Sequence, residues 1–331
     1  MPAGKKRSVR GGDALLEALR SVSEAPETDA ARAVIERALA HDNWLIVSQA
    51  AALVGRHLLH GFEPALREVW NRFVANAAKA DPGCRAKEAA LTALDQLETL
   101  DPDPFLPAIR YVQLEPVAGG RVDTAGGVRQ RGLYALLRMH HSDAGLFAGE
   151  LMADADAAVR RGVCRGLGQY GNRDSASLLL YKLHSGDEDP VVVSEAAAAL
   201  LDLASDVGLD LLGRWLRSHD ESHREAAALA LGQSHEEAAI SLLVRWLDDG
   251  LGDDDFELGA RALGLSRSDT ARNALLAIVQ NGARRRAEQA VHALGVHSYD
   301  ARLARQVRER AASNERAELG SLVDRVFGHE P

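Results

Sequence analysis

The stretch Val159-Arg160-Arg161-Gly162-Val163-Cys164-Arg165-Gly166-Leu167-Gly168 decides the fold that we predict for this chain. Counted from Val159 as position zero, apolar or small residues stand at positions zero, four, seven and eight. These positions share one face of a helix that has about 3.6 residues per turn. The stretch therefore predicts an amphipathic helix with one buried face.

The same frame recurs along the chain. It matches five further segments: 128–136, 192–200, 223–231, 255–263 and 286–294. Position eight is always leucine, at Leu136, Leu167, Leu200, Leu231, Leu263 and Leu294, in steps of 31, 33, 31, 32 and 31. Position seven is always Ala or Gly, which lets a neighbouring helix approach closely. A steady period in the range of about 20–50 residues predicts stacked supersecondary units.

A second series lies between these helices. Leu211–Leu216 and Leu242–Leu247 match residue for residue except at Gly213 and Val244, again 31 apart. Each repeat is thus expected to hold an outer helix, a short turn and an inner helix, and neither helix can bury its apolar face alone. We predict an all-α fold, a right-handed α-solenoid of about eight helical pairs. Trp215 and Trp246 occupy matched outer positions, which favours packing between outer helices over base stacking.

The period also suggests how the chain is organised. Residues 1–12 are expected to be a disordered basic tail, 13–127 irregular helical pairs, 128–297 the regular repeats, and 298–331 capping helices rich in charge. Within the irregular part, helices are expected at 13–20, 28–40, 42–59, 63–76 and 85–97. Segment 115–127 has four glycines and a proline and is expected to be an unstructured loop. That loop is either a tolerated surface insertion or a flap over the binding face.

Composition narrows the class of protein. Hydrophobic residues make up 46% of the 331 residues but aromatics only 5%, and this Ala- and Leu-rich content favours packed helices over a β-sandwich.

The net charge is −9 although the first ten residues carry four basic side chains, so the rest of the chain is acidic. This acidity disfavours nonspecific binding to DNA and to anionic membranes. Cys84 and Cys164 form no CxxC pattern, which fits a reducing cytoplasm without a disulfide or zinc site. No apolar run is long enough to span a membrane, and the basic N-terminus lacks the apolar segment of a secretory signal.

The motif Val-Arg-x-x-small-x-x-small-Leu-Gly, preceded by Asp156, resembles the HEAT repeat. It is similar to the short bacterial type known as the phycobilisome-lyase HEAT-like repeat, over about residues 40–297. In that family the arginine pairs with an acidic residue of a neighbouring repeat. Three copies of the motif keep this arginine, at Arg129, Arg160 and Arg224, but three other copies have a different residue there. The resemblance therefore implies a series of ion pairs between repeats, a ladder, that is interrupted after the central repeats. The resemblance implies the fold and is nearly silent on function, since such arrays serve mostly as scaffolds.

Enzymes that resemble these repeats provide an alternative to the scaffold. Deoxyhypusine hydroxylases hold two irons with several His-Glu dyads on inner helices, whereas the one dyad within these repeats, His235-Glu236, is expected to open an outer helix. Alkylpurine DNA glycosylases of this class need a groove that is basic along its whole length. Bilin lyases resemble this chain only in their type of repeat. The acid runs at Asp187–Asp189 and Asp253–Asp255 are interpreted as helix-dipole partners rather than metal ligands. We therefore predict no cofactor, no metal site and no catalytic residue.

Inner-helix positions two, three and six should face the groove of the solenoid. They supply the candidate partner-binding residues: Arg131, Tyr134, Arg161, Arg165, Glu195, Glu225, Arg261 and His292. Tyr134 is equally compatible with the core and with the groove. Arginine and tyrosine are common interface anchors, so the expected function is to bind a protein or peptide. The groove would be basic at its centre, where nucleic acid could bind, and acidic toward the C-terminal end.

Overall fold

The computed structural model describes residues 3–75, 77–315 and 318–328. The chain divides into two compact units, with unit 1 ending at Gly171 and unit 2 beginning at Asn172. The regular period runs straight through this boundary, which lies far from the one that the sequence suggested at residues 127 and 128. Periodicity reports on the local frame of each helix, whereas compactness depends on which helices touch, so the two criteria divide the chain differently.

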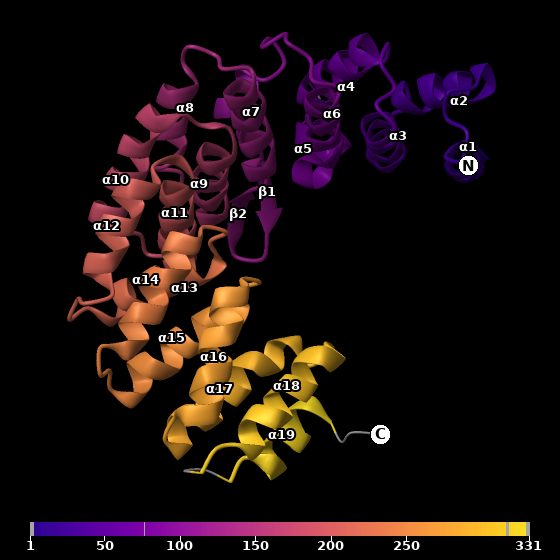
Figure 1. The fold of residues 1–331 in the computed structure, drawn as a ribbon. Coiled ribbons are helices and arrows are strands. Elements are labelled where there is room, and N and C mark those ends of the chain that lie inside the picture. The colour runs from indigo at the N-terminus through magenta and orange to yellow at the C-terminus, as the bar shows by residue number, and fades with distance from the viewer. Residues whose placement is uncertain (1–2, 76, 316–317, 329–331) are drawn as a thin grey trace. The chain divides into compact units, whose positions relative to one another are not determined.

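Unit 1 is a stack of helix pairs. Its helices are α1 (Ala3–Val22), α2 (Asp29–Leu39), α3 (Trp44–Arg56), α4 (Glu63–Ala75), the short α5 (Ala77–Ala80), α6 (Arg85–Gln96), α7 (Gly126–Arg138), α8 (Ala144–Leu151) and α9 (Ala157–Tyr170). Two 3-10 turns, η1 (Pro82–Cys84) and η2 (Pro107–Arg110), and the strands β1 (Leu114–Val117) and β2 (Gly120–Asp123) complete it. Helices α3, α6, α7 and α9 lie side by side as the inner layer (Figure 1).

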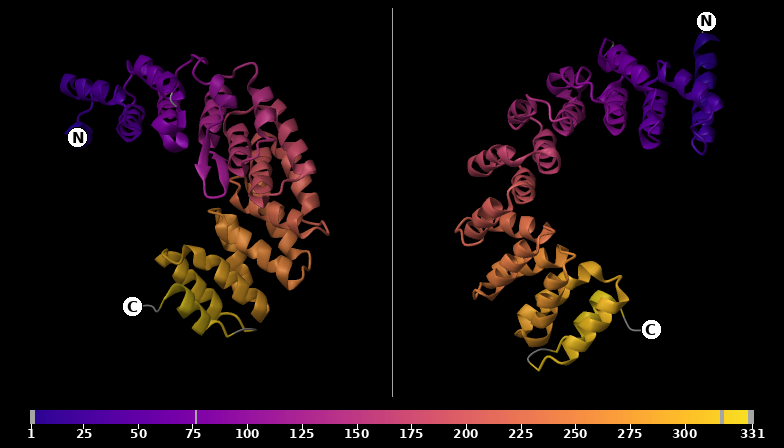
Figure 2. Two further views of the ribbon diagram at one scale, coloured as in Figure 1. Left: turned by 180° about the vertical axis from the view of Figure 1, so that it is seen from behind. Right: turned by 45° about the horizontal axis from the view of Figure 1, so that its top comes forward.

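Unit 2 continues the same plan. It holds η3 (Arg173–Ser175), α10 (Ala176–Ser185), α11 (Pro190–Leu203), α12 (Ser205–Trp215), α13 (Glu221–Gln233), α14 (Glu237–Asp248), α15 (Asp253–Leu265), α16 (Asp269–Asn281), α17 (Arg284–Leu294), η4 (Gly295–His297), α18 (Ala301–Ala312) and α19 (Gly320–Phe327). The inner layer is α11, α13, α15 and α17, and the outer layer is α12, α14, α16 and α18, as the two further views also show (Figure 2). The predicted all-α solenoid is confirmed.

The repeated frame is the buried core of both units. All six copies fall within the inner-layer helices α7, α9, α11, α13, α15 and α17. The leucine at position eight is fully buried in four copies and at most 2% exposed in the other two. Burying a leucine side chain stabilises a fold by roughly 1.5–3 kcal/mol, so each copy of this position helps to hold the stack together.

Glycine directly after the position-eight leucine brings neighbouring inner helices close together. A Cβ placed on Gly232 of α13 would lie 2.3 Å from the carbonyl oxygen of Ala262 in α15. One on Gly264 of α15 would lie 2.4 Å from the carbonyl oxygen of Ala293 in α17. Since real Cβ atoms do not approach backbone so closely, any larger residue at Gly232 or Gly264 would push the helices apart.

The arginine at position one of an inner helix forms ion pairs that join consecutive repeats. Arg129, 6% exposed, donates from Nε to Asp154 Oδ2 (2.7 Å) and from Nη1 to Asp123 Oδ2 (2.6 Å). Arg224 donates from Nε to Asp255 Oδ1 (2.8 Å) at the start of the next inner helix. Phe256 takes position one of α15, and there the guanidinium of Arg286 lies 4.6 Å from the phenyl ring centroid. The expected interruption of the ladder is thus present at Phe256, where a cation–π contact replaces the ion pair.

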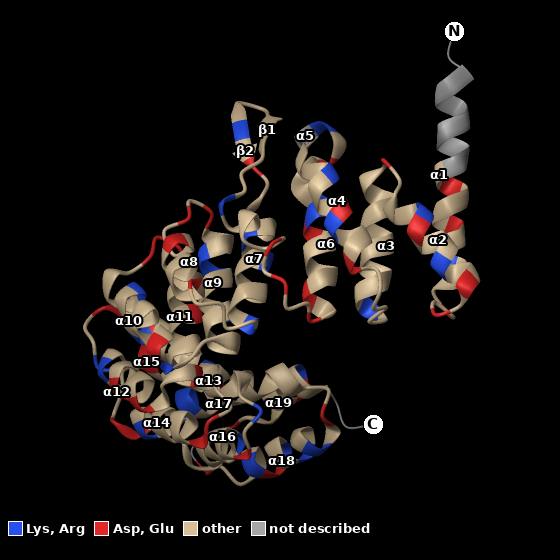
Figure 3. Cartoon of the chain, turned by 90° about the horizontal axis from the view of Figure 1, so that it is seen from above, with Lys and Arg blue, Asp and Glu red and all other residues tan. Residues whose placement is uncertain are grey.

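Segment 115–127, expected to be an unstructured loop, forms structure. Strands β1 and β2 pair antiparallel, with Leu114 opposite Asp123 and Val117 opposite Gly120, and α7 already begins at Gly126. The hairpin projects beyond the N-terminal end of α7 (Figure 3). It is held at its base, because the Glu115 carboxylate accepts hydrogen bonds from Gly83 N (2.6 Å), Gln113 Nε2 (2.7 Å) and Thr124 Oγ1 (2.8 Å). Gly83 lies 32 residues before Glu115, so the local composition of the segment does not reveal this contact.

Two smaller expectations differ from the structure. Helix α1 begins at Ala3, so the range expected to be a disordered tail is helical where it is described; residues 1 and 2 lie outside the described residues. Alanine, lysine and arginine are favourable helix residues, which is consistent with this extension. Helix α3 begins at Trp44 rather than at residue 42, because Asn43 caps it by accepting a hydrogen bond at Oδ1 from Leu45 N (2.9 Å).

The indoles of Trp215 and Trp246 are buried and lie against inner-layer residues. The Trp215 ring stacks on that of His223, and Trp246 lies beside Gly259.

The end of unit 2 has the expected charged composition. Helix α18 buries one narrow stripe, of which Leu303 and Val307 are part, and its other faces carry charge (Figure 3). Arg302, Arg305, Glu309 and Arg310 are exposed on it. Within the described part of the chain, no helix is both long and apolar enough to cross a membrane.

Candidate binding groove

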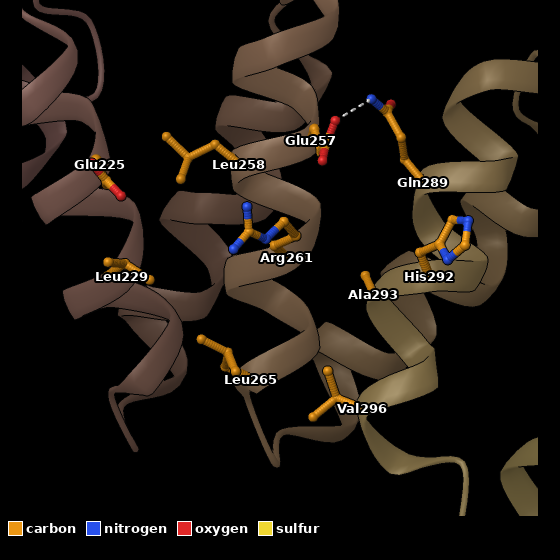
Figure 4. Close-up of a pocket in the computed structure, with 10 residues that line it drawn as sticks. All are labelled: Glu225, Leu229, Glu257, Leu258, Arg261, Leu265, Gln289, His292, Ala293 and Val296. Atoms are coloured by element: carbon orange, nitrogen blue, oxygen red, sulfur yellow. Dashed lines mark hydrogen bonds between the residues drawn. The ribbon is translucent and has the colours of Figure 1, made fainter. Parts of the chain in front are cut away.

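Three of the predicted partner-binding residues meet in one groove of unit 2. Glu225 of α13, Arg261 of α15 and His292 of α17 line a hollow of about 490 Å³ that crosses these consecutive inner-layer helices (Figure 4). All three side chains are exposed. The repeat explains the convergence, because Glu225 stands at position two of its helix while Arg261 and His292 stand at position six. Both positions lie on the helix face opposite the buried stripe of positions zero, four, seven and eight.

The charges of these three residues are not used within the fold. In the described part of the chain, no hydrogen bond or ion pair joins Glu225, Arg261 or His292 to another residue. Their neighbour Glu257 has only a long contact, 3.5 Å from Gln289 Nε2 to its Oε2, drawn as the dashed line in Figure 4. An acid, a guanidinium and an imidazole that serve no internal pair remain available to a ligand.

Apolar side chains form the walls between these polar groups. Leu229, Leu258, Leu265, Ala293 and Val296 line the same hollow, and Leu265 and Val296 are 42% and 53% exposed. Sequence reasoning missed these walls. Leu229 and Leu258 occupy positions six and three, so the frame could have revealed them, but Leu265 and Val296 lie at position ten, beyond the end of the frame.

A second hollow continues the first toward α11. It has about 520 Å³ and shares Glu225 and Leu229 with the first hollow. Its further lining comes from the end of α10, the turn before α11, α11 itself and the start of α13: Leu183, Gly186, Asp187, Glu188, Pro190, Val191, Val193, Ser194, Asp220, Ser222, His223 and Ala226. We call the two hollows together the C-terminal groove. Glu195, also predicted to bind a partner, is half-buried on α11 and lines neither hollow.

The other predicted residues lie on two neighbouring helices of unit 1. On α7, the Arg131 guanidinium Nε lies 3.8 Å from Glu88 Oε1 of α6. The half-buried Tyr134 ring packs against α9, with its centroid 6.1 Å from that of Tyr170, and a Cβ on Gly166 would lie 2.6 Å from its Cε1. Tyr134 therefore serves packing between α7 and α9. On α9, Arg161 is half-buried and Arg165 is exposed.

Unit 1 also holds a network of buried charges that the sequence did not reveal. Lys87, fully buried at position one of α6, has its Nζ 2.9 Å from Asp81 Oδ2. Burial acts to raise the pKa of Asp123, but hydrogen bonds from Gln113 N, Ala125 N and Arg129 outweigh it and hold that pKa below its usual value. The network fastens the hairpin to the helix stack and presents no open site.

Comparison with known proteins identifies the repeats. The family model described as HEAT repeats matches residues 123–200, 145–218 and 178–255. Residues 123–255 are HEAT repeats. The HEAT region thus contains the second hollow and the α13 part of the first, and the remaining helices of unit 2 extend the same stack. No curated protein matches the chain.

Several solved structures share the helical architecture at low identity. The complex of CpcE and CpcF of phycocyanin lyase from Nostoc sp. PCC7120 is 16% identical, with 85% of this chain and 93% of that chain covered and a TM-score of 0.33. An engineered protein is 15% identical, with 99% and 95% covered and a TM-score of 0.40. Human deoxyhypusine hydroxylase in complex with glycerol is 18% identical, with 91% and 100% covered and a TM-score of 0.27. At such identities and TM-scores they carry no argument about activity.

Proposed function

We propose that this HEAT-repeat chain is a non-catalytic scaffold that holds a peptide segment of a partner protein in its C-terminal groove. The observation that carries the proposal is a set of polar side chains, Glu225, Arg261 and His292, that line one groove and have no internal partner among the described residues. Exposed charges beside apolar walls are the combination that a polypeptide can satisfy, because it offers both side chains and backbone polar groups. Arginine in particular is a frequent anchor of protein interfaces.

The charge of the groove argues against nucleic acid at this place. Glu225 and Glu257 lie in the same hollow as Arg261, and Asp187, Glu188 and Asp220 line the adjoining one. A surface that follows a phosphate backbone needs positive charge along its length. The arginines Arg131, Arg161 and Arg165 of α7 and α9 remain a prediction for a second contact surface in unit 1.

The test compares the groove with another exposed surface of the same unit. The full chain and its Glu225→Ala/Arg261→Ala/His292→Ala variant are used to capture partners from the native host, and each captured protein is then purified and titrated calorimetrically. We expect the groove variant to weaken the partner's Kd by at least about tenfold, equivalent to about 1.4 kcal/mol. The matched control is Arg305→Ala/Glu309→Ala on α18, which should bind as the unmodified chain does. A partner that binds the groove variant with unchanged Kd would refute the proposal.

A further inference from the structure

Glutamate recurs at position two of three consecutive inner helices. The residues are Glu225 of α13, Glu257 of α15 and Glu288 of α17, in steps of 32 and 31. Neighbouring packed helices have axes about 8–10 Å apart, so the row repeats at about that interval across the groove. Glu288 is bound by Arg284 Nε at 2.9 Å, whereas Glu225 and Glu257 line the first hollow of the C-terminal groove. The available part of the row is therefore a pair of carboxylates about one helix spacing apart.

Acidic residues outnumber basic ones along the whole groove. The two hollows are lined by five carboxylates (Asp187, Glu188, Asp220, Glu225 and Glu257) against the single arginine Arg261 and two histidines, His223 and His292. Asp187 is paired with Lys182, and Asp220 caps α13 by accepting a hydrogen bond from Ser222 N, which leaves Glu188, Glu225 and Glu257. The groove therefore favours a cationic occupant.

Apolar side chains separate the carboxylates. Leu258 of α15 lies between Glu225 and Glu257 in the first hollow, and Leu229 lies beside Glu225 one turn along α13 (Figure 4). Val191, 44% exposed, adds an apolar side chain in the second hollow. An occupant that is only charged would leave these side chains in water. One that alternates charge with aliphatic residues would cover them.

We infer that the groove binds a peptide segment in the polyproline II conformation in which lysine or arginine recurs at every third position. A polyproline II chain has about three residues per turn and advances about 3.1 Å per residue, so every third side chain returns to the same side after about 9 Å, which matches the spacing of adjacent inner helices. One basic residue pairs with Glu225 and the next with Glu257, and an aliphatic residue between them packs on Leu229 and Leu258. Arg261 then contacts a backbone carbonyl or an acidic residue of the segment. This inference rests on the proposed function and names the partner chemistry of the same groove.

The test measures fluorescence anisotropy with labelled twelve-residue peptides and the full chain. One peptide carries lysine at every third position among leucine, valine and serine, a second has the same composition with its lysines clustered, and a third replaces every lysine by glutamate. We expect the first to bind at least about fivefold more tightly than the second, and the third to show no binding. Each of Glu225→Gln and Glu257→Gln should weaken the first peptide by up to about fivefold, in the range of partly exposed ion pairs, and added salt should reduce that difference.

A variant outside the groove serves as the control for this experiment. Glu309→Gln on α18 removes an exposed carboxylate outside the groove and should leave every Kd unchanged. Equal affinity of the periodic and clustered peptides, preference for the glutamate peptide, or binding of a DNA oligonucleotide in competition with the peptide would each overturn the inference. If no cationic peptide binds but a host protein still binds in a manner sensitive to the groove variant, the inference fails and the proposed function stands. If no partner is sensitive to the groove, both fail.

Discussion

Replacement of Arg129 by methionine tests whether the buried ion pairs of unit 1 hold its hairpin and helices together. Methionine keeps much of the apolar stem but leaves Asp154, whose side chain is 10% exposed, and Asp123, 27% exposed, without their shared cation. It also removes the hydrogen bond from Nη1 to the carbonyl of Tyr111 (3.0 Å). Removing one partner of a buried pair costs about 3–5 kcal/mol, and the partial solvation of Asp123 favours the lower end, about 3 kcal/mol.

The assay is thermal and urea unfolding of the full chain, followed by calorimetry and tryptophan fluorescence. For a unit of this size, about 3 kcal/mol lowers the Tm of its transition by about 6–12 °C. Trp70 is a local reporter, because its ring meets that of Tyr111 edge-on with centroids 5.7 Å apart. Its signal should therefore move with the unit 1 transition.

The matched control is Arg173→Met. Arg173 makes two hydrogen bonds to Asp206, but both side chains are well exposed, so its loss should be hardly measurable. The reasoning is refuted if Arg129→Met unfolds at the same midpoint as Arg173→Met. The dependence of the unfolding free energy on pH gives a second test, because the direction of the change can be predicted. Since the pKa of Asp123 is held below its usual value, its contribution is complete above about pH 4 and is lost as pH falls through the depressed value. In Arg129→Met this acid-induced loss should shrink.

Three further predictions concern the core. Leu231→Ala removes a fully buried side chain and should cost about 2–5 kcal/mol in urea unfolding; a cost near zero would mean that the repeated frame is misassigned. Gly232→Ala should destabilise by about 1–3 kcal/mol because its Cβ would meet backbone of α15 at 2.3 Å, whereas Gly213→Ala, with nothing nearer than 3.6 Å, should stabilise by about 0.5–1 kcal/mol; the same sign for both would contradict the packing argument. Cys84 is 1% exposed and burial raises the pKa of its thiol to about 11, so a thiol reagent at pH 8 should label it only after urea is added, and rapid labelling of the native chain would disagree.

The helical stack could be predicted because its signal is local and repeated. Each inner helix carries its own apolar stripe, and six leucines at position eight made the frame unambiguous. The same frame predicted that Glu225, Arg261 and His292 share one side of the inner layer, because positions two and six are neighbours on the helix face opposite the stripe. Helix geometry alone is enough for both inferences.

The hairpin could not be predicted in the same way. Its strands have four residues each, Pro116 and the glycines of the segment suggest a loop, and an isolated two-stranded hairpin is only marginally stable. It forms because Glu115 reaches Gly83, 32 residues away, and Asp123 reaches Arg129. Interactions between distant residues leave no periodic trace in the sequence.

By itself, then, the sequence determined the fold class and the position of every inner helix, and it predicted a face for partner binding that stays a prediction. The tertiary structure alone decided where the chain divides into compact units, that Tyr134 packs between helices, and that Glu225, Arg261 and His292 line one hollow without a partner among the residues that the structure describes. The physical reason is the separation along the sequence of the residues that interact. A helical frame is set by residues three and four apart, whereas a groove and its unpaired charges depend on which side chains of neighbouring helices come within contact distance.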